Sequence, residues 1–291
     1  MDHRITVGLD GSPESGAAAR WAAREAALRG AELRLFHAEG SSVPVGAPAA
    51  TSEVRRGWAE ALLQDSAEAL HHVHPELRIT RESFDGPPAA SLATAAASAD
   101  LLVLGSRGLG TLTGFVLGSV AMAVLHSTGR PVVLVRGGEG GSPRPAVEQA
   151  RRDVVVGVDI SRPCDAVLAF AFEEAARRSC RLHVLYAWPL PVMVGYGGGY
   201  DPRVHAEINE NMTADLAEVL GPWRDRFPAV DATARTPMGR AAQKLVDRGA
   251  EAGLIVVGRR IRRSPFGAHI GSTTHAVIHH ALTPVAVIAH D

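Results

Sequence analysis

The chain has 291 residues, of which 46% are hydrophobic and 21% are charged, and its formal net charge is −1. This composition supports a packed core and excludes a disordered chain, and the near-neutral charge gives no support for a nucleic-acid partner. No apolar stretch approaches the roughly 20 residues of a membrane span, and the start of the chain, MDHRITVGLDGS, lacks a signal-peptide pattern. The two cysteines, Cys164 and Cys180, indicate a reducing, cytoplasmic location.

Short apolar runs alternate with Ala-rich segments along the first half of the chain. The runs ITVGL, ELRLFHA, LRITRESF, DLLVLG and PVVLVR predict strands, and helical spacing predicts helices over 15–29, 53–72, 88–98 and 117–127. Strands of consecutive Val, Ile and Leu are typical of parallel sheets that are covered on both faces. The alternation therefore predicts a doubly wound α/β layer with right-handed crossovers.

The second half of the chain repeats the first. Residues 5–38 resemble residues 154–187 at an offset of 149. Later segments repeat at an offset of 153, so that ADLLVLGSRG matches AGLIVVGRRI and RPVVLV matches TPVAVI. A repeat of this length indicates a duplicated domain rather than a solenoid unit.

The two offsets differ because the second copy contains an insertion, and a linker connects the two copies. The second copy gains four residues, which we place in the Gly-rich loop at 193–201. A Gly- and Pro-rich stretch without apolar rhythm joins the copies. We therefore predict a first domain at 1–137, a linker at 138–151 and a second domain at 152–291.

The stretch GSRGLGTLTGFVLGSV holds five glycines directly behind the apolar run LLVL. Gly105, Gly108 and Gly118 are separated by two and nine residues, and Ser119 follows at the start of a predicted helix. Glycine permits close approach to the backbone, and a helix start offers N–H groups to an anion. The stretch lacks the lysine of a P-loop and follows the fourth strand, unlike the dinucleotide fingerprint. Spacing alone leaves two interpretations open, a phosphate cradle and a tight strand-to-helix turn.

VGLDGS, the DGPP turn, ADLLVLGSRG and the GSV helix start all resemble the universal stress protein family, and residues 105–119 match its ATP-binding pattern G-2x-G-9x-G-[ST]. The resemblance covers essentially the whole chain as two tandem copies. It implies two flavodoxin-like domains, similar to the adenine nucleotide alpha hydrolases, each with a five-stranded parallel sheet flanked by helices. It also implies ATP or AMP with Mg²⁺, a cytoplasmic role in stress or dormancy regulation, and a homodimer-like pairing through the last strands.

The resemblance also implies ligand contacts in the first copy. Asp10 would lie near the adenine and ribose, Ala38 beside the adenine and Gly105 beside the ribose. The phosphates would be met by Gly108, Gly118, Ser119 and the amide of Val120, with Arg107 as a further phosphate partner or a solvated loop charge. Asp10 has an alternative role as a turn or helix cap, although Asp159 recurs at the matching place.

The second copy departs from the pattern in one place. Its matching site residues are Asp159, Gly258, Gly271 and Ser272, but Ile261 stands where the pattern has Gly. A β-branched residue at positive φ costs on the order of 1–2 kcal/mol. We therefore predict that the first domain binds ATP and that the second binds it weakly or not at all.

Other chemistry-bearing residues are given structural interpretations. His275 and His279 have metal-capable spacing, but we find no HExxH pattern and no third ligand, so we interpret them as surface or dimer-contact residues. Trp58 and Trp223 are interpreted as packing residues of the second helix of each copy. We expect no catalytic residue and no metal bound by the protein alone.

The sequence thus predicts an ATP-binding, adenylate-responsive regulator of an unidentified protein partner. One alternative is a slow ATPase or adenylate-forming enzyme of the same α/β group. The other is an interaction scaffold with a vestigial pocket.

Overall fold

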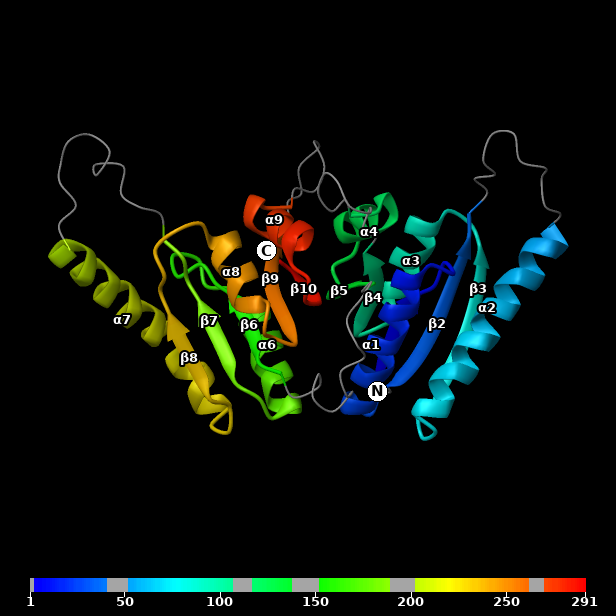
Figure 1. Cartoon of the computed structure of the whole chain (residues 1–291), viewed down its shortest axis with the longest axis horizontal. Helices are drawn as coiled ribbons and strands as arrows, with labels where there is room; N and C mark the ends of the chain where they lie inside the picture. The colour runs from blue at the N-terminus through cyan, green and yellow to red at the C-terminus, as the bar shows by residue number, and fades with distance from the viewer. Residues whose placement is uncertain (1–2, 41–51, 107–116, 138–151, 189–201, 262–269) are drawn as a thin grey trace. The chain divides into compact units, whose positions relative to one another are not determined.

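Both halves of the chain fold as the strand–helix alternation predicts (Figure 1). A computed structural model describes residues 3–40, 52–106, 117–137, 152–188, 202–261 and 270–291. The described residues form two compact units, called the N-terminal unit (residues 3–137) and the C-terminal unit (residues 152–260 and 270–291). None of the described helices combines the length and apolar character needed to cross a membrane.

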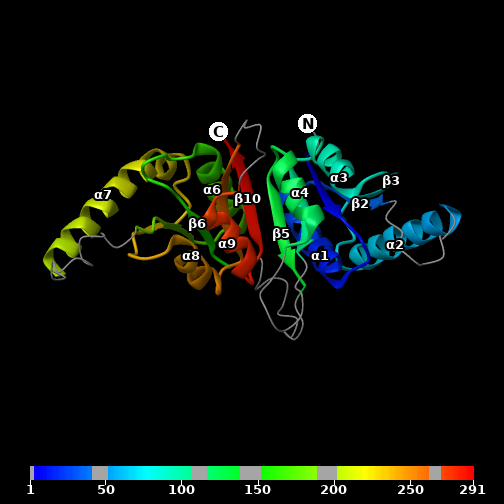
Figure 2. The same ribbon diagram turned by 90° about the horizontal axis from the view of Figure 1, so that it is seen from above.

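The N-terminal unit is one parallel sheet in the order β3-β2-β1-β4-β5. Its elements are β1 (Arg4–Gly8), α1 (Pro13–Arg29), β2 (Glu32–Glu39), α2 (Ser52–Val73), β3 (Ile79–Asp85), α3 (Pro88–Ala97), β4 (Leu101–Ser106), α4 (Ser119–Ser127) and β5 (Val132–Arg136). Helices α1 and α2 contact each other on one face, and α3 and α4 contact each other on the opposite face (Figure 2). The strand order reverses between β1 and β4, so the carboxyl ends of these strands open a crevice.

The C-terminal unit has the same topology, with its sheet in the order β10-β9-β6-β7-β8. Its elements are β6 (Val154–Gly157), α6 (Asp165–Arg178), β7 (Leu182–Leu185), α7 (Pro202–Arg226), β8 (Ala232–Arg235), α8 (Ala241–Gly249), β9 (Leu254–Arg260), α9 (Ser272–His280) and β10 (Val285–His290). Helices α6 and α7 contact each other, as do α8 and α9. The predicted fold class, two tandem five-stranded parallel α/β units, is confirmed.

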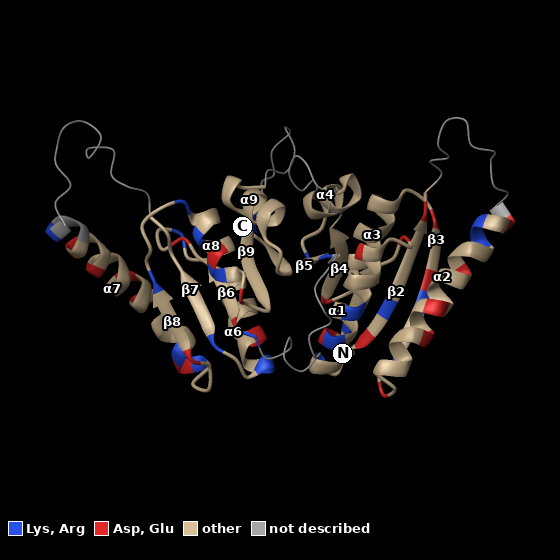
Figure 3. Ribbon diagram, in the orientation of Figure 1, with Lys and Arg blue, Asp and Glu red and all other residues tan. Residues whose placement is uncertain are grey.

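The central strands are buried on both faces, as their unbroken apolar runs predict. Ile5, Val7 and Val103 are fully buried in the N-terminal unit, and Val155 and Val256 are fully buried in the C-terminal unit. Charged side chains lie mainly on the helices and the outer strands, and α2 carries both signs along its length (Figure 3). Water removal from these strands is the main driving force for each unit.

The two predicted packing tryptophans differ. Trp223 stacks on Phe172 and Phe227, with ring centroids 5.9 and 6.5 Å away. Trp58 instead keeps 51% of its surface exposed, so the interpretation as a packing residue is wrong for this side chain. Its exposure requires another explanation, because a half-exposed indole loses about half of the free energy that full burial would provide.

One buried polar position differs between the units in a coordinated way. Arg34 on β2 is buried, and its Nη2 donates to the carbonyl of Ala95 at 2.6 Å, near the end of α3. The matching residue on β7 is His183, whose Nε2 lies 2.7 Å from Nη2 of Arg248 on α8. Arg248 occupies the position of Ala95, so the cation sits on the strand in one unit and on the helix in the other.

Candidate functional site

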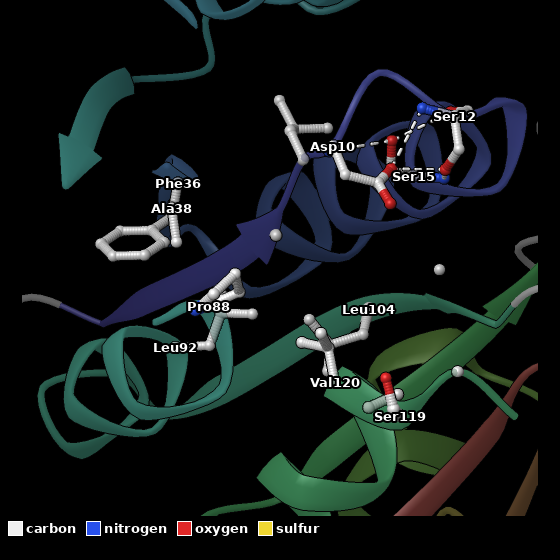
Figure 4. A pocket seen from close by; sticks show the side chains of 15 residues that line it. Asp10, Ser12, Ser15, Phe36, Ala38, Pro88, Leu92, Leu104, Ser119 and Val120 are labelled. Carbon is white, nitrogen blue, oxygen red and sulfur yellow. Dashed lines mark hydrogen bonds between the residues drawn. The ribbon is translucent and has the colours of Figure 1, made fainter. Parts of the chain in front are cut away.

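A cavity of about 300 Å³ lies at the carboxyl ends of β1, β2 and β4 in the N-terminal unit. It is lined by Gly8, Leu9, Asp10, Ser12, Ser15, Phe36, Ala38, Pro88, Leu92, Leu104, Gly105, Gly118, Ser119, Val120 and Ala121. Figure 4 shows the labelled side chains around it. This is the crevice that the strand order predicts for a ligand in an open α/β sheet.

One part of the cavity is apolar. Phe36 and Ala38 come from β2, Pro88 and Leu92 come from the first turns of α3, and Leu104 comes from β4. Ala38 is a predicted site residue, whereas the sequence analysis assigns no site role to Phe36, Pro88, Leu92 or Leu104. Their positions follow from the fold alone, because the ends of neighbouring parallel strands meet at one edge. A slot of this kind fits a flat, apolar-faced ring.

The other part of the cavity is polar. Ser12, Ser15 and Ser119 bring hydroxyl groups, and α4 begins here with Gly118 at its N-cap. Gly118 has no side chain to accept a hydrogen bond from the first turn of α4. The N–H groups and the positive dipole end of this helix are therefore directed at the cavity, an arrangement that suits an anion.

Asp10 stands on a turn that it also builds. Its Oδ1 accepts hydrogen bonds from Ser12 N at 3.0 Å and Ser12 Oγ at 2.5 Å, while Ser12 Oγ accepts from Ser15 N at 3.2 Å and so caps α1. In the C-terminal unit, Asp159 Oδ1 accepts from Ser161 N at 3.0 Å and Ser161 Oγ at 2.6 Å. The turn therefore explains why this aspartate recurs, and its place on the cavity wall is an additional property of Asp10.

Gly105 lacks a side chain for a reason of packing. A Cβ at this position would lie 2.7 Å from backbone atoms of Glu14 and Ser15 in the first turn of α1. The end of β4 and the start of α1 can approach this closely only because Gly105 has no Cβ. This contact brings the β1–α1 turn and the β4 end together at the cavity.

The structure brings together most of the site residues predicted for the first copy. Asp10, Ala38, Gly105, Gly118, Ser119 and Val120 all line the cavity. Arg107 and Gly108 lie outside the described residues, as does the loop at 193–201. The described residues of the predicted first-copy site therefore lie around one cavity.

The matching residues of the second copy are arranged differently. Gly258 follows the buried run Leu254–Val257 of β9, Gly271 is the N-cap of α9 and Ser272 is the first residue of that helix. Thr274 Oγ1 donates to the carbonyl of Gly258 at 2.7 Å, which ties α9 to β9. The matching residue of the first copy is Ala121, which lines the cavity and has no hydroxyl. In the second copy, a hydrogen bond therefore joins the strand to the helix at the position where Ala121 lines the cavity of the first copy.

Two more residues alter this region of the second copy. The ring of His290 lies 2.9 Å from where a Cβ of Gly258 would stand, at the position that Gly137 holds in the first copy. Among the described non-glycine residues, a positive φ occurs at Ser179 and not at Ile261. Ile261 therefore does not adopt the strained left-handed conformation that a glycine at its position would allow. Ile261 itself therefore has a backbone conformation that a β-branched residue allows.

Tyr186 introduces a titratable group beside Asp159. Burial, together with the charges of Asp159 and Asp215, raises the pKa of the Tyr186 phenol. The matching residue of the first copy is His37, which belongs to a different set of contacts. The environment of the recurring aspartate is thus not preserved between the copies.

A larger cavity, of about 490 Å³, lies near the C-terminal ends of α1 and α2. One of its charged wall residues, Glu32, already pairs with Arg4 Nε at 3.3 Å and with Nε of Arg78, another wall residue, at 3.4 Å. It carries no glycine-rich turn and no helix N-terminus, because the helices end here. The smaller cavity is therefore the better candidate site.

The histidine pair on α9 has adjacent rings. The ring centroids of His275 and His279 are 4.2 Å apart, and burial, with His279 and His280 nearby, lowers the pKa of His275. Among the described residues, no group of three or more His, Cys, Asp or Glu side chains is placed to hold a metal ion.

Comparisons with known proteins give a consistent result. The model described as "Universal stress protein family" matches residues 1–136 and 150–289. A universal stress protein of Mycobacterium tuberculosis is 32% identical over 98% of this chain and 96% of its own length. A crystal structure of a universal stress protein from Archaeoglobus fulgidus superposes with a TM-score of 0.71 at 19% identity, covering 99% of this chain and 98% of that one.

A third match covers one repeat. The crystal structure of a universal stress protein in complex with cAMP is 27% identical over 47% of this chain and 98% of that one. Its TM-score is 0.37, so it supports no inference about the cavity of this chain.

Proposed function

Because this chain belongs to the universal stress protein family, we propose that it binds ATP or AMP in the cavity of its N-terminal unit and acts as an adenylate-responsive regulator. The observation that supports this is the division of one cavity into an apolar slot and a polar end. The slot of Phe36, Pro88 and Leu92 would take the adenine, and the start of α4 would take the phosphates.

The ligand would act through a difference in affinity between two conformations of the protein. A nucleotide shifts a conformational equilibrium only by as much as it prefers one state over the other. We propose that the shifted state binds a regulatory protein in a cytoplasmic stress or dormancy response. The observation to seek is a partner whose binding depends on ATP or AMP.

Mg²⁺ would accompany ATP rather than occupy a protein site of its own. Mg²⁺ prefers oxygen ligands and keeps several waters, and it is commonly held by one or two carboxylates together with phosphates. On the described cavity wall the carboxylate is Asp10, which fits this limited part. When bound, the ion would neutralise phosphate charge.

The C-terminal unit is proposed to bind nucleotide weakly or not at all. The support is the Thr274–Gly258 hydrogen bond, the ring of His290 over Gly258, and Ile261 in place of a glycine. The retained residues Gly271 and Ser272 keep the helix start, so weak anion binding there is compatible with the proposal.

The two N-cap glycines provide a matched experiment. Gly118 and Gly271 have φ of −60° and −58°, and no atom of the described residues lies within 4 Å of a Cβ added to either. The two positions therefore offer the same space for a Cβ, but at Gly118 a valine would project towards the bound phosphates. We expect G118V to abolish calorimetric binding of AMP and of ATP with Mg²⁺, and G271V to preserve it.

The same experiment distinguishes the other functions. If the parent protein binds no nucleotide, the result favours the alternative function of an interaction scaffold with a vestigial pocket. Binding that is lost equally in both variants, or in neither, would contradict the assignment to the N-terminal unit. Release of phosphate or exchange of pyrophosphate by the purified protein would identify an enzyme.

We also propose that the two copies pair through their last strands, and that the chain forms a homodimer. Strands β5 and β10 each stand at one end of the strand order of their own unit, and an edge strand presents unpaired backbone groups unless another strand covers it. A protease site inserted in the linker at 138–151 tests the pairing. The two halves should co-elute after cleavage, and separation would contradict the proposal, while light scattering reports the oligomeric state.

A further inference from the structure

The loop Leu9–Gly11, which carries Asp10 to the cavity, is supported from outside by two aromatic side chains. The buried His37 donates a hydrogen bond from Nδ1 to the carbonyl of Leu9 at 2.8 Å. Trp58, from α2, lies edge-on to His37, with ring centroids 5.3 Å apart and an interplanar angle of 71°. The imidazole is therefore held between the loop and the indole.

Trp58 also contacts the loop directly. Gly11 has φ of +79°, and a Cβ at this position would lie 2.9 Å from Cζ2 of Trp58. The indole thus rests against the backbone of Gly11, the residue after Asp10. Half of the indole surface faces solvent, so core packing does not explain a tryptophan here.

In the second copy, different residues stand at the positions of Gly11, His37 and Trp58. At the offsets of 149 for the first strand and 153 for the second helix, the residues matching Gly11, His37 and Trp58 are Ile160, Tyr186 and Asn211. The helices α2 and α7 end at matching residues, which supports this alignment.

All three contacting positions have therefore changed together, yet the Asp159–Ser161 turn is intact. The aromatic support is not required to form the turn. It is present in the copy that has the complete glycine pattern and absent from the copy that has lost it. This correlation connects the support to the ligand site rather than to folding.

We propose that Trp58 and His37 are positioning residues of the nucleotide site, which hold the Leu9–Gly11 loop and couple ligand occupancy to the outer face of α2. The inference rests on the proposed function of the cavity. A loop held in its binding geometry before the ligand arrives costs less to order on binding, so affinity rises. A ligand that presses on Asp10 would in turn move the indole, which a partner can contact from solvent.

Calorimetry with AMP on the full chain tests the positioning role. We expect W58A and H37L each to weaken AMP binding about tenfold, and their combination to weaken it little further, because both remove the same support. H37N should retain binding, since its amide can donate to the Leu9 carbonyl in place of Nδ1. Val54→Ala, an exposed position one turn earlier on α2, is the matched control and should bind as the parent does.

Fluorescence tests the coupling separately from stability. The emission spectrum of Trp58 is obtained by subtracting the spectrum of W58F from that of the parent. We expect saturating AMP to shift or quench this difference spectrum. The change should disappear in H37L and persist in H37N and V54A. A purely structural role would lower the melting temperature without producing this ligand-dependent difference.

The outcomes separate this inference from the function on which it rests. A parent protein that binds neither AMP nor ATP refutes the proposed function, and the positioning role fails with it. Parent binding together with unchanged affinity in W58A and H37L, or with a Trp58 emission that ignores AMP, overturns the positioning role alone.

Discussion

The N-terminal and C-terminal units share strand order, parallel pairing and helix placement, but they differ at the strand–helix junctions. In the N-terminal unit, α1 begins at Pro13, is capped by Ser12 and packs on Gly105. In the C-terminal unit, α6 begins at Asp165 without a side-chain cap, and His290 lies over Gly258. The comparison teaches that a duplicated α/β unit can keep its core while the junction chemistry that a ligand needs is altered.

The largest expected effect concerns the two matching strand-end glycines. G105A would place a Cβ 2.7 Å from the backbone of Glu14 and Ser15, which cannot move without shifting α1. We expect a loss of about 2–3 kcal/mol in the free energy of unfolding. G258A meets the far end of the His290 ring and a methyl of Val167, so its cost should stay below about 1 kcal/mol. Chemical denaturation followed by circular dichroism measures both, and equal losses would contradict the difference in packing.

Restoring the first copy's residues in the second copy sharpens the comparison. I261G with T274A removes the branched residue and the Thr274–Gly258 hydrogen bond. In a G118V background, where the N-terminal site is disabled, we expect AMP affinity of the second site to rise at least about tenfold, or ~1.4 kcal/mol. Calorimetry reads this gain, and an unchanged titration would show that the block lies elsewhere.

Alkaline pH should affect the C-terminal unit selectively. Burial raises the pKa of the Cys180 thiol from 9.0 to about 11, and the matching residue of the N-terminal unit is the non-titrating Ala31. Below pH 9 the thiol is protonated in both folded and unfolded chains. Between pH 9 and 11 the unfolded chain loses this proton first, so stability falls as pH rises, by about 1–2 kcal/mol. Urea titrations of the parent and C180A should differ in slope over this range, and identical slopes would refute the assignment.

The smallest effect concerns the helix ends. Gly30 ends α1 with φ of 60°, and Ser179 ends α6 at the matching place with φ of 49°. Glycine adopts this conformation without the steric cost that the Cβ of serine carries, so S179G should stabilise the protein by about 1 kcal/mol or less. Thermal unfolding measures the change. A melting temperature at or below that of the parent would mean that local contacts of Ser179 offset its backbone strain.

The sequence was sufficient for much of the fold because both strand burial and duplication leave direct patterns. Helices expected at 15–29 and 88–98 are observed at Pro13–Arg29 and Pro88–Ala97, since helical spacing and proline mark their limits. Motifs in the sequence also identified several residues that line the cavity of the first copy, such as Gly118 and Ser119.

The remainder depended on long-range contacts that no local pattern encodes. Leu92 and Leu104 reach the cavity only because β4 lies beside β1. The recurrence of Asp159 in the sequence favours a ligand role, whereas in the structure a turn hydrogen bond explains it. The Trp58–His37–Leu9 contacts join three separate elements, so periodicity along any one of them could not reveal the set.

The relocated cation at Arg34 and Arg248 limits how the two copies can be recombined. A chimaera that carries the β7 sequence in place of β2 would put histidine opposite Ala95 and leave the end of α3 without its guanidinium donor. The reverse graft would set two guanidinium groups against each other beside α8. Strand and helix must therefore be transplanted as a pair, which makes the pair, rather than either segment, the unit in which these duplicated domains can exchange sequence.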